Sequence, residues 1–187
     1  MKTISLLGVL IVLLVGAAQA GTLVEMKTNV GTIKLELADD KAPLSVQNFL
    51  KYVDQKFYDG TVFHRVIGNF MIQGGGFDQS LKQKSTLAPI KNEAGNGLTN
   101  EKGTIAMART SDINSATSQF FINLVDNDFL NHRGASAKTF GYAVFGQVIA
   151  GMDVVEKIGR IKTIAKSAAF RDFPEPKVII ESIRRVE

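Results

Sequence analysis

The stretch that decides the fold is residues 62–76, which read VFHRVIGNFMIQGGG. Most of its side chains are apolar, yet Arg65 and Gln73 stand among them and three glycines close the run. An apolar surface that carries a few fixed polar groups is typical of a ligand site. The alternative is an ordinary barrel strand with an arginine that snorkels to solvent, because long charged side chains are seldom buried without a partner.

The stretch is interpreted as two short strands, so its side chains can be assigned to faces. Successive side chains of a strand point to opposite faces of the sheet. This alternation predicts that Phe63, Arg65 and Ile67 share one face of the first strand. It also predicts that Met71 and Gln73 share one face of the second, and Phe70 and Ile72 the other. Each strand then presents at least one polar group among apolar neighbours.

The rest of the sequence adds further short strands and two helices. Apolar residues at helical spacing predict helices over about 43–56 and from residue 152 to about 158. Alternating or apolar runs bounded by turn residues predict strands at 22–28, 32–37, 103–109, 118–124, 140–149 and 177–186. In the 118–124 strand, Gln119 and Phe121 fall on one face and Phe120 and Ile122 on the other. Residues 77–100 show little periodicity and are expected to form a long functional loop. This pattern predicts an all-β barrel capped by two helices.

Composition excludes several classes of function. The 187 residues are 45% hydrophobic, which suits one domain with a sizeable core. The net charge of +4 is small and scattered, so nucleic-acid binding is not expected. Cysteine is absent and only two histidines occur, which argues against a metal centre and predicts no cofactor. His64 is expected to be a buried, hydrogen-bonded side chain rather than a catalytic base, and His132 to be solvated.

The first twenty residues form a separate unit. A lysine near the start, an apolar run and the small-residue sequence Ala18-Gln19-Ala20 predict a cleavable secretory signal peptide over 1–20. A membrane anchor is the alternative, but the apolar run is shorter than the roughly 20 residues that a span requires. We therefore expect one domain over 21–187, exported and free of the membrane after cleavage.

The catalytic motifs of common enzymes are missing. The three glycines at 74–76 are not followed by the lysine of a phosphate-binding loop, and no serine lies in a Gly-x-Ser-x-Gly elbow. The acidic residues around Asn127 lack the further oxygen ligands of a calcium loop. What remains is a site made of one arginine, two glutamines and several apolar side chains. Such a site can bind and distort a ligand but not hydrolyse it.

Several motifs in the same order resemble the cyclophilin family of peptidyl-prolyl isomerases, and most closely its exported bacterial branch. These are FHRVI (63–67), NFMIQGGG (69–76), MA (107–108), SQFFI (118–122) and VFG (144–146). The resemblance extends from about Leu23 to Val186. It implies a closed eight-stranded antiparallel β-barrel capped by two α-helices, and a periplasmic enzyme that accelerates rotation about X-Pro bonds and assists the folding of exported proteins. A non-catalytic proline-peptide binding module or chaperone on the same barrel is the alternative.

The resemblance also implies the site. It places the catalytic arginine at Arg65. The residues that it implies for binding the peptide are Phe70, Met71, Gln73, Ala108, Arg109, Gln119, Phe121, Phe129, Leu130 and Tyr142. The implied partners are proline-containing segments of unfolded or folding proteins, and a monomer is expected.

Three positions depart from the pattern of many eukaryotic members. Phe129 replaces a tryptophan, so weak cyclosporin binding is expected. Tyr142 replaces a pocket histidine and Arg109 an asparagine. His132 is not the missing histidine, because it precedes the segment that aligns with it.

Overall fold

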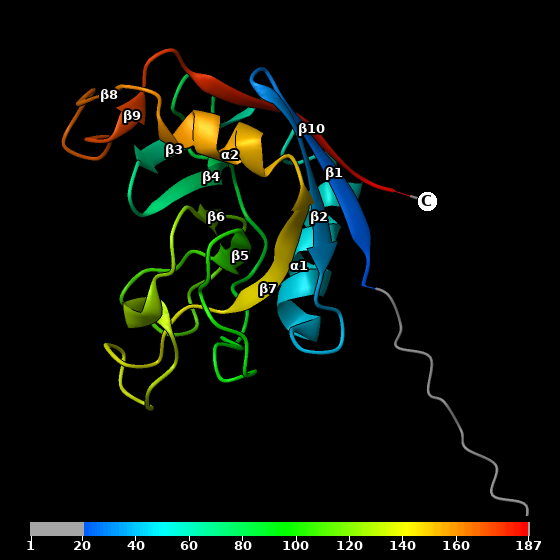
Figure 1. Cartoon of the computed structure of the whole chain (residues 1–187). Helices are drawn as coiled ribbons and strands as arrows, with labels where there is room; N and C mark the ends of the chain where they lie inside the picture. The colour runs from blue at the N-terminus through cyan, green and yellow to red at the C-terminus, as the bar shows by residue number, and fades with distance from the viewer. Residues whose placement is uncertain (1–20, 187) are drawn as a thin grey trace, which may run out of the picture.

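Eight antiparallel strands close into a barrel, as the sequence predicted (Figure 1). The computed structural model describes residues 21–186, so the expected signal peptide lies outside the described residues. The strands of the barrel are β1 (Leu23–Thr28), β2 (Gly31–Leu37), β3 (Thr61–Ile67), β4 (Met71–Asp78), β5 (Thr104–Met107), β6 (Phe120–Asn123), β7 (Val144–Ala150) and β10 (Val178–Arg185). Around the barrel their order is β1-β10-β3-β4-β6-β5-β7-β2.

Two helices cover the barrel and complete its core. They are α1 (Pro43–Asp54) and α2 (Met152–Gly159), and Figure 1 shows them at separate ends of the barrel. Each contributes its apolar stripe to the main core, including Phe49 from α1 and Ile158 from α2. The core is rich in aromatic rings: Phe49 packs against Phe120 and Phe145 with ring centroids 5.7 and 5.3 Å apart. The helical spacing in the sequence therefore located both helices.

One predicted face was wrong. Phe63 does not share a face with Arg65 but enters the main core together with Val66. Between the pairs Phe63–Gly74 and Arg65–Gln73, β3 advances two residues while β4 advances one. This β-bulge inserts an extra residue into β3. The side chains before and after the bulge therefore do not follow one alternation of faces. Beyond the bulge, Arg65 and Ile67 lie on the same face, as predicted.

Several boundaries differ from the sequence prediction. The 103–109, 118–124 and 140–149 strands are shorter at their starts or ends, and α1 ends at Asp54 rather than near residue 56. The structure also has elements that were not predicted: a two-stranded sheet of β8 (Thr163–Ile164) and β9 (Phe173–Pro174), and the short 3-10 helix η1 (Asp128–Leu130). The first turn of α1 is capped by Glu93, whose carboxylate accepts hydrogen bonds from the backbone N–H groups of Leu44 and Ser45.

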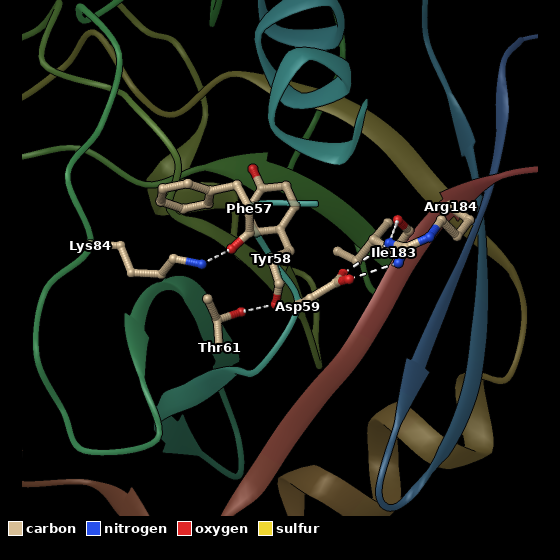
Figure 2. Close-up of polar contacts among 7 residues, drawn as sticks. All are labelled: Phe57, Tyr58, Asp59, Thr61, Lys84, Ile183 and Arg184. Atoms are coloured by element: carbon tan, nitrogen blue, oxygen red, sulfur yellow. Dashed lines mark hydrogen bonds and ion pairs between the residues drawn. The ribbon is translucent and has the colours of Figure 1, made fainter. Parts of the chain in front are cut away.

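The turn that leads into β3 is fixed by local polar contacts, by a loop lysine and by an arginine of the distant strand β10 (Figure 2). The carboxylate of Asp59 accepts two hydrogen bonds from the guanidinium of Arg184 on β10, at 2.8 and 2.7 Å. Thr61 donates its hydroxyl to the Tyr58 carbonyl at 2.6 Å, and the Lys84 ammonium donates to the Phe57 carbonyl. These contacts hold the start of β3 beside β10. Arg65 lies further along the same strand.

Candidate active site

A second apolar cluster lies outside the barrel core, over the strands β4, β6, β5 and β7. Its buried members are Met71, Ala106, Phe121, Leu130 and Val144. The partly buried residues packed against it are Ile67, Phe70, Leu98, Ala108 and Tyr142. The resemblance implied six of these ten residues for peptide binding, and the structure brings all six together. We call the ten residues the proline pocket, after the role that the resemblance implies.

Alternation explains how the strands divide their side chains between the pocket and the core. On β6, Phe121 belongs to the proline pocket while Phe120 and Ile122 belong to the main core. On β4, Met71 faces the pocket and Ile72 the core. The predicted faces of β6 are therefore confirmed, and so is the separation of Met71 from Ile72 on β4. Phe70, which was predicted to share the face of Ile72, packs with Met71 instead, because it lies in the turn before β4. One sheet thus presents two apolar surfaces: one faces the interior of the barrel, and the other packs against residues from outside the strands, such as Leu130 and Tyr142.

Arg65 stands at the edge of the pocket. It pairs with Gln73 across the β3–β4 ladder, and its guanidinium carbon lies 6.0 Å from the centre of the Phe70 ring. Its Nε donates to a carboxylate oxygen of Asp172 at 3.4 Å. Asp172 is itself fixed, because its backbone carbonyl accepts the N–H of Val66 at 2.9 Å. Among residues 21–186 the two terminal amino groups of Arg65 have no hydrogen-bond partner, so they are available to a ligand.

The two glutamines meet beside the arginine. Gln73 on β4 donates its side-chain amide to the Gln119 side-chain carbonyl at 3.0 Å. This bond leaves the Gln73 carbonyl oxygen and the Gln119 amide nitrogen free to bind a peptide backbone. The backbone N–H of Ala108 already donates to the backbone carbonyl of Gln119 at 3.0 Å. Ala108 can therefore contribute its own backbone carbonyl, but not its N–H, to a bound peptide.

Aromatic rings form the walls of the pocket. Phe121 and Tyr142 meet edge to face with centroids 5.7 Å apart, and Phe70 stacks on Phe129 at 5.5 Å. Phe129 remains 59% exposed, which leaves a ring face open at the rim. Arg109 lies over Tyr142, with its guanidinium carbon 4.7 Å from the ring centre.

The three nitrogen atoms of the Arg109 guanidinium each donate one hydrogen bond. They bond to the backbone carbonyls of Thr110, Ala137 and Gly141, at 2.9, 3.0 and 3.1 Å. These contacts hold Arg109 against Tyr142 and the loop that carries it.

A solvent-open hollow of about 720 Å³ lies beside the pocket rather than over it. It is bordered by the end of β2, the loop 97–101 and β7, and it shares Leu98 and Val144 with the proline pocket. Its acidic lining residues are Glu36, Asp39, Asp40 and Glu101. Within residues 21–186 no group of three or more His, Asp or Glu side chains is placed to hold a metal ion. No helix in the same range is long and apolar enough to cross a membrane.

Comparison with known proteins decides the family. The sequence pattern of cyclophilin-type peptidyl-prolyl cis-trans isomerases matches residues 23–185. The chain belongs to this family. A peptidyl-prolyl cis-trans isomerase of Acinetobacter baylyi is 58% identical over 167 residues, which cover 89% of this chain and 87% of that protein. Peptidyl-prolyl cis-trans isomerase B of Escherichia coli is 56% identical over 161 residues, covering 86% and 98%.

Solved structures give the same fold. A crystal structure of a Cryptosporidium parvum cyclophilin-type isomerase matches with a TM-score of 0.72 at 26% identity, covering 89% of this chain and 98% of that one. A second crystal structure of that protein, determined in the presence of the dipeptide Ala-Pro, also matches with a TM-score of 0.72. Family and relatives together make this chain a peptidyl-prolyl cis-trans isomerase, so the sequence-based prediction of a catalytic barrel is confirmed.

Sequence reasoning missed some neighbours of the isomerase site. Ala106 pairs with Phe121 across β5 and β6, so alternation along β5 would have placed it in the pocket. Leu98 lies in an irregular loop, where no periodicity gives a signal. Asp172 is 107 positions from Arg65, and neither sequence spacing nor composition connects the two residues.

His64, next to Arg65, is buried on the other side of the strand. Its ring packs against Phe77 and Phe170, with centroids 4.7 and 6.2 Å away, and Nδ1 has no hydrogen-bond partner. Burial is the main reason that the pKa of His64 is lowered to about 4. The charge of Arg65 also lowers this pKa, whereas the backbone of Val62 raises it. The predicted burial is confirmed. At neutral pH the imidazole is uncharged, and its ring packs against Phe77 and Phe170 rather than against the residues of the proline pocket.

We expect this isomerase to lose stability in mild acid because of His64. In the unfolded chain the histidine pKa is about 6.5, so below that pH the unfolded state binds a proton that the folded state excludes. The stability that neutral His64 contributes is present above pH 6.5 and is lost as the pH drops towards 4. By pH 5 the loss should amount to about 2 kcal/mol of unfolding free energy. Urea unfolding at pH 7 and pH 5 measures it, and His64→Phe should remove that part of the pH dependence. An equal pH dependence in both proteins would contradict the assignment.

Proposed function

We propose that Arg65 catalyses isomerisation by donating a hydrogen bond to the nitrogen of the prolyl peptide bond. The planar bond resists rotation by roughly 18 to 20 kcal/mol, because the nitrogen lone pair is delocalised into the carbonyl. As the bond twists, the lone pair localises on nitrogen and becomes a hydrogen-bond acceptor. A guanidinium placed there stabilises the twisted state more than either planar state, which is the differential binding that catalysis requires.

The observation that carries this proposal is the state of the guanidinium. Asp172 holds Arg65 through Nε, and the two terminal amino groups keep no partner among the described residues. Asp172 thus orients the side chain, while the terminal amino groups keep their hydrogen-bond donors for a substrate. Exchange spectroscopy on an X-Pro test peptide, with the natural chain and with variants of Arg65, tests this role.

The arginine supplies only part of the required acceleration. A hydrogen bond to a charged group is worth roughly 1.5 to 3 kcal/mol, and about 1.4 kcal/mol corresponds to one power of ten in rate. Arg65 therefore accounts for one or two powers of ten. The rest comes from the proline pocket, which would grip the proline ring through Met71, Phe121 and Leu130 and exclude water from the bond.

The polar groups beside Arg65 hold one side of the rotating bond. The free carbonyl of Gln73, the free amide of Gln119 and the Ala108 carbonyl would bind the peptide backbone next to proline. The other side of the bond remains free to turn. Weak cyclosporin binding follows from Phe129, because its ring has no N–H donor where a tryptophan would have one.

The isomerase is proposed to act on exported proteins in the periplasm as a monomer. The support is the sequence 1–20, with its charged start, apolar run and small residues before Gly21. X-Pro bonds isomerise over tens to hundreds of seconds without a catalyst, slowly enough to delay folding after export. Proline-containing segments of unfolded clients are the substrates that this role implies.

Expression of the full chain in a Gram-negative host should yield a periplasmic protein that starts at Gly21, because signal peptidase cleaves after a small-x-small sequence. Mass spectrometry of the periplasmic and cytoplasmic fractions measures this. The matched variant Ala20→Asp should keep the precursor uncleaved, since a charged residue does not fit a small-residue cleavage site. A natural chain that retains Met1 in the cytoplasmic fraction would contradict export.

A further inference from the structure

Three buried asparagines lie behind the proline pocket, although they come from separate parts of the chain. Asn123 ends β6, where it pairs with Met71, and Asn127 directly precedes η1. Asn100 belongs to the long loop before β5. All three side chains are at most 2% exposed. A buried amide is costly unless its polar atoms are hydrogen-bonded, so the partners of these groups show what they stabilise.

The asparagine side chains bond to backbone carbonyls of pocket residues. Asn127 donates to the Phe70 carbonyl at 3.0 Å. The Asn100 amide nitrogen shares its two hydrogens among the Asn131 side-chain oxygen at 3.1 Å and the carbonyls of Leu130 and Tyr142 at 3.3 and 3.4 Å. Phe70, Leu130 and Tyr142 all lie outside the strands of the barrel, where no sheet ladder fixes the backbone. Two amides thus contact three of the five pocket residues that lie outside the strands; the other two are Leu98 and Ala108.

The same side chains are bonded to one another. Asn127 donates to the side-chain oxygen of Asn123 at 2.8 Å, and Asn123 donates to that of Asn100 at 3.3 Å. Asn123 also donates to the hydroxyl of Thr104 on β5 at 2.9 Å. The backbone adds a further link, since the Asn127 N–H donates to the Asn100 carbonyl at 2.8 Å. Such connected networks of buried polar groups specify one arrangement of the elements they join.

We propose that Asn100, Asn123 and Asn127 are positioning residues of the isomerase, and that they set the width of the proline pocket without contacting the substrate. The proposal rests on the proposed binding role of the pocket. The network ties the turn that carries Phe70 and the loops that carry Leu130 and Tyr142 to the end of β6. A pocket built on loops keeps its geometry only when surrounding hydrogen bonds hold those loops in place. The long irregular loop thus acts from behind the site, through Asn100.

Asn127→Ala and Asn100→Ala test the proposal in the full-length chain. Each removes the donors to pocket carbonyls, so the proline ring should be gripped less well in both the planar and the twisted states. We expect KM for an X-Pro peptide to rise about two- to tenfold, the loss that one hydrogen bond represents. We expect kcat to change less than KM, because the lost binding is uniform. The methyl ¹³C shifts of Met71 and Leu130 should also move.

Thr61→Val is the matched control, since it also removes a buried side-chain donor to a backbone carbonyl (Figure 2). Thr61 begins β3, at the opposite end of the strand from Ile67 in the pocket. The control should lower the melting temperature and leave KM and the methyl shifts unchanged.

If both folded asparagine variants also show a lower melting temperature with unchanged KM and methyl shifts, the proposal is overturned. The network would then have a purely structural role. Asn127→Ser, which keeps a hydroxyl donor, is measured instead if an alanine variant does not fold. The catalytic role of Arg65 is judged separately, because it predicts a change in kcat.

Discussion

Arg65→Ala is expected to lower kcat for X-Pro isomerisation about 10- to 100-fold while the chain stays folded. The expected loss equals one charged hydrogen bond that forms fully only as the prolyl bond twists. Because the missing contact belongs to the transition state, kcat and kcat/KM should fall together. Exchange spectroscopy on a Xaa-Pro peptide gives both constants, and circular dichroism checks the fold.

Arg65→Lys separates charge from shape. A lysine keeps the positive charge but loses the planar fork that lets Nε bind Asp172 while the terminal amino groups face a ligand. We therefore expect it to recover only part of the rate. An unchanged kcat in Arg65→Ala would refute the catalytic role.

Arg184→Ala is the matched control for the removal of an arginine. Arg184 and Arg65 have equally exposed side chains, 43% in each case, and each pairs with an aspartate. Arg184 pairs with Asp59 at the start of β3, outside the proline pocket (Figure 2). Its removal should cost some stability and leave kcat within about twofold, because exposed ion pairs contribute little to stability and this one touches no pocket residue.

Patterns between neighbouring residues predicted the parts of the site that depend on regular strand geometry. The faces of β6 follow from alternation alone, since Phe121 and Phe120 are neighbours on a regular strand. The same rule failed at Phe63, because the β-bulge depends on how β4 pairs with β3 and not on the residues of β3 themselves. Periodicity located both helices, but it did not find the Glu93 side chain that caps α1 from 48 or more residues away.

The supporting contacts of the site could not be predicted in the same way. Asp172 reaches Arg65, and Asn100 reaches Tyr142, only because the barrel closes and brings loops together. Such contacts depend on tertiary geometry, whereas composition and spacing report on neighbours along the chain. The resemblance to a family supplied the residues that are proposed to face the substrate. The residues behind them required the structure.

Phe121 is the second position where a large effect is expected, because the ring serves both the pocket and the fold. It is 4% exposed, packs edge to face on Tyr142 and lies opposite Gln73 in the β4–β6 ladder. Removing a buried phenyl ring typically costs about 3 to 5 kcal/mol of unfolding free energy. A domain of this size has about 5 to 15 kcal/mol in total, so the variant should fold but with a lower melting temperature.

Phe121→Ala should also raise KM for X-Pro peptides more than tenfold, since the proline ring loses a large apolar surface of its proposed pocket. Titration of a proline peptide, followed through ring shifts of Phe70, measures binding apart from the rate. The milder pair Phe121→Leu and Phe120→Leu supplies the control: the two positions are adjacent, but Phe120 faces the core. Both leucine variants should lose stability, and only Phe121→Leu should lose affinity. Equal affinity in the two would mean that the ring at position 121 does not contact the substrate.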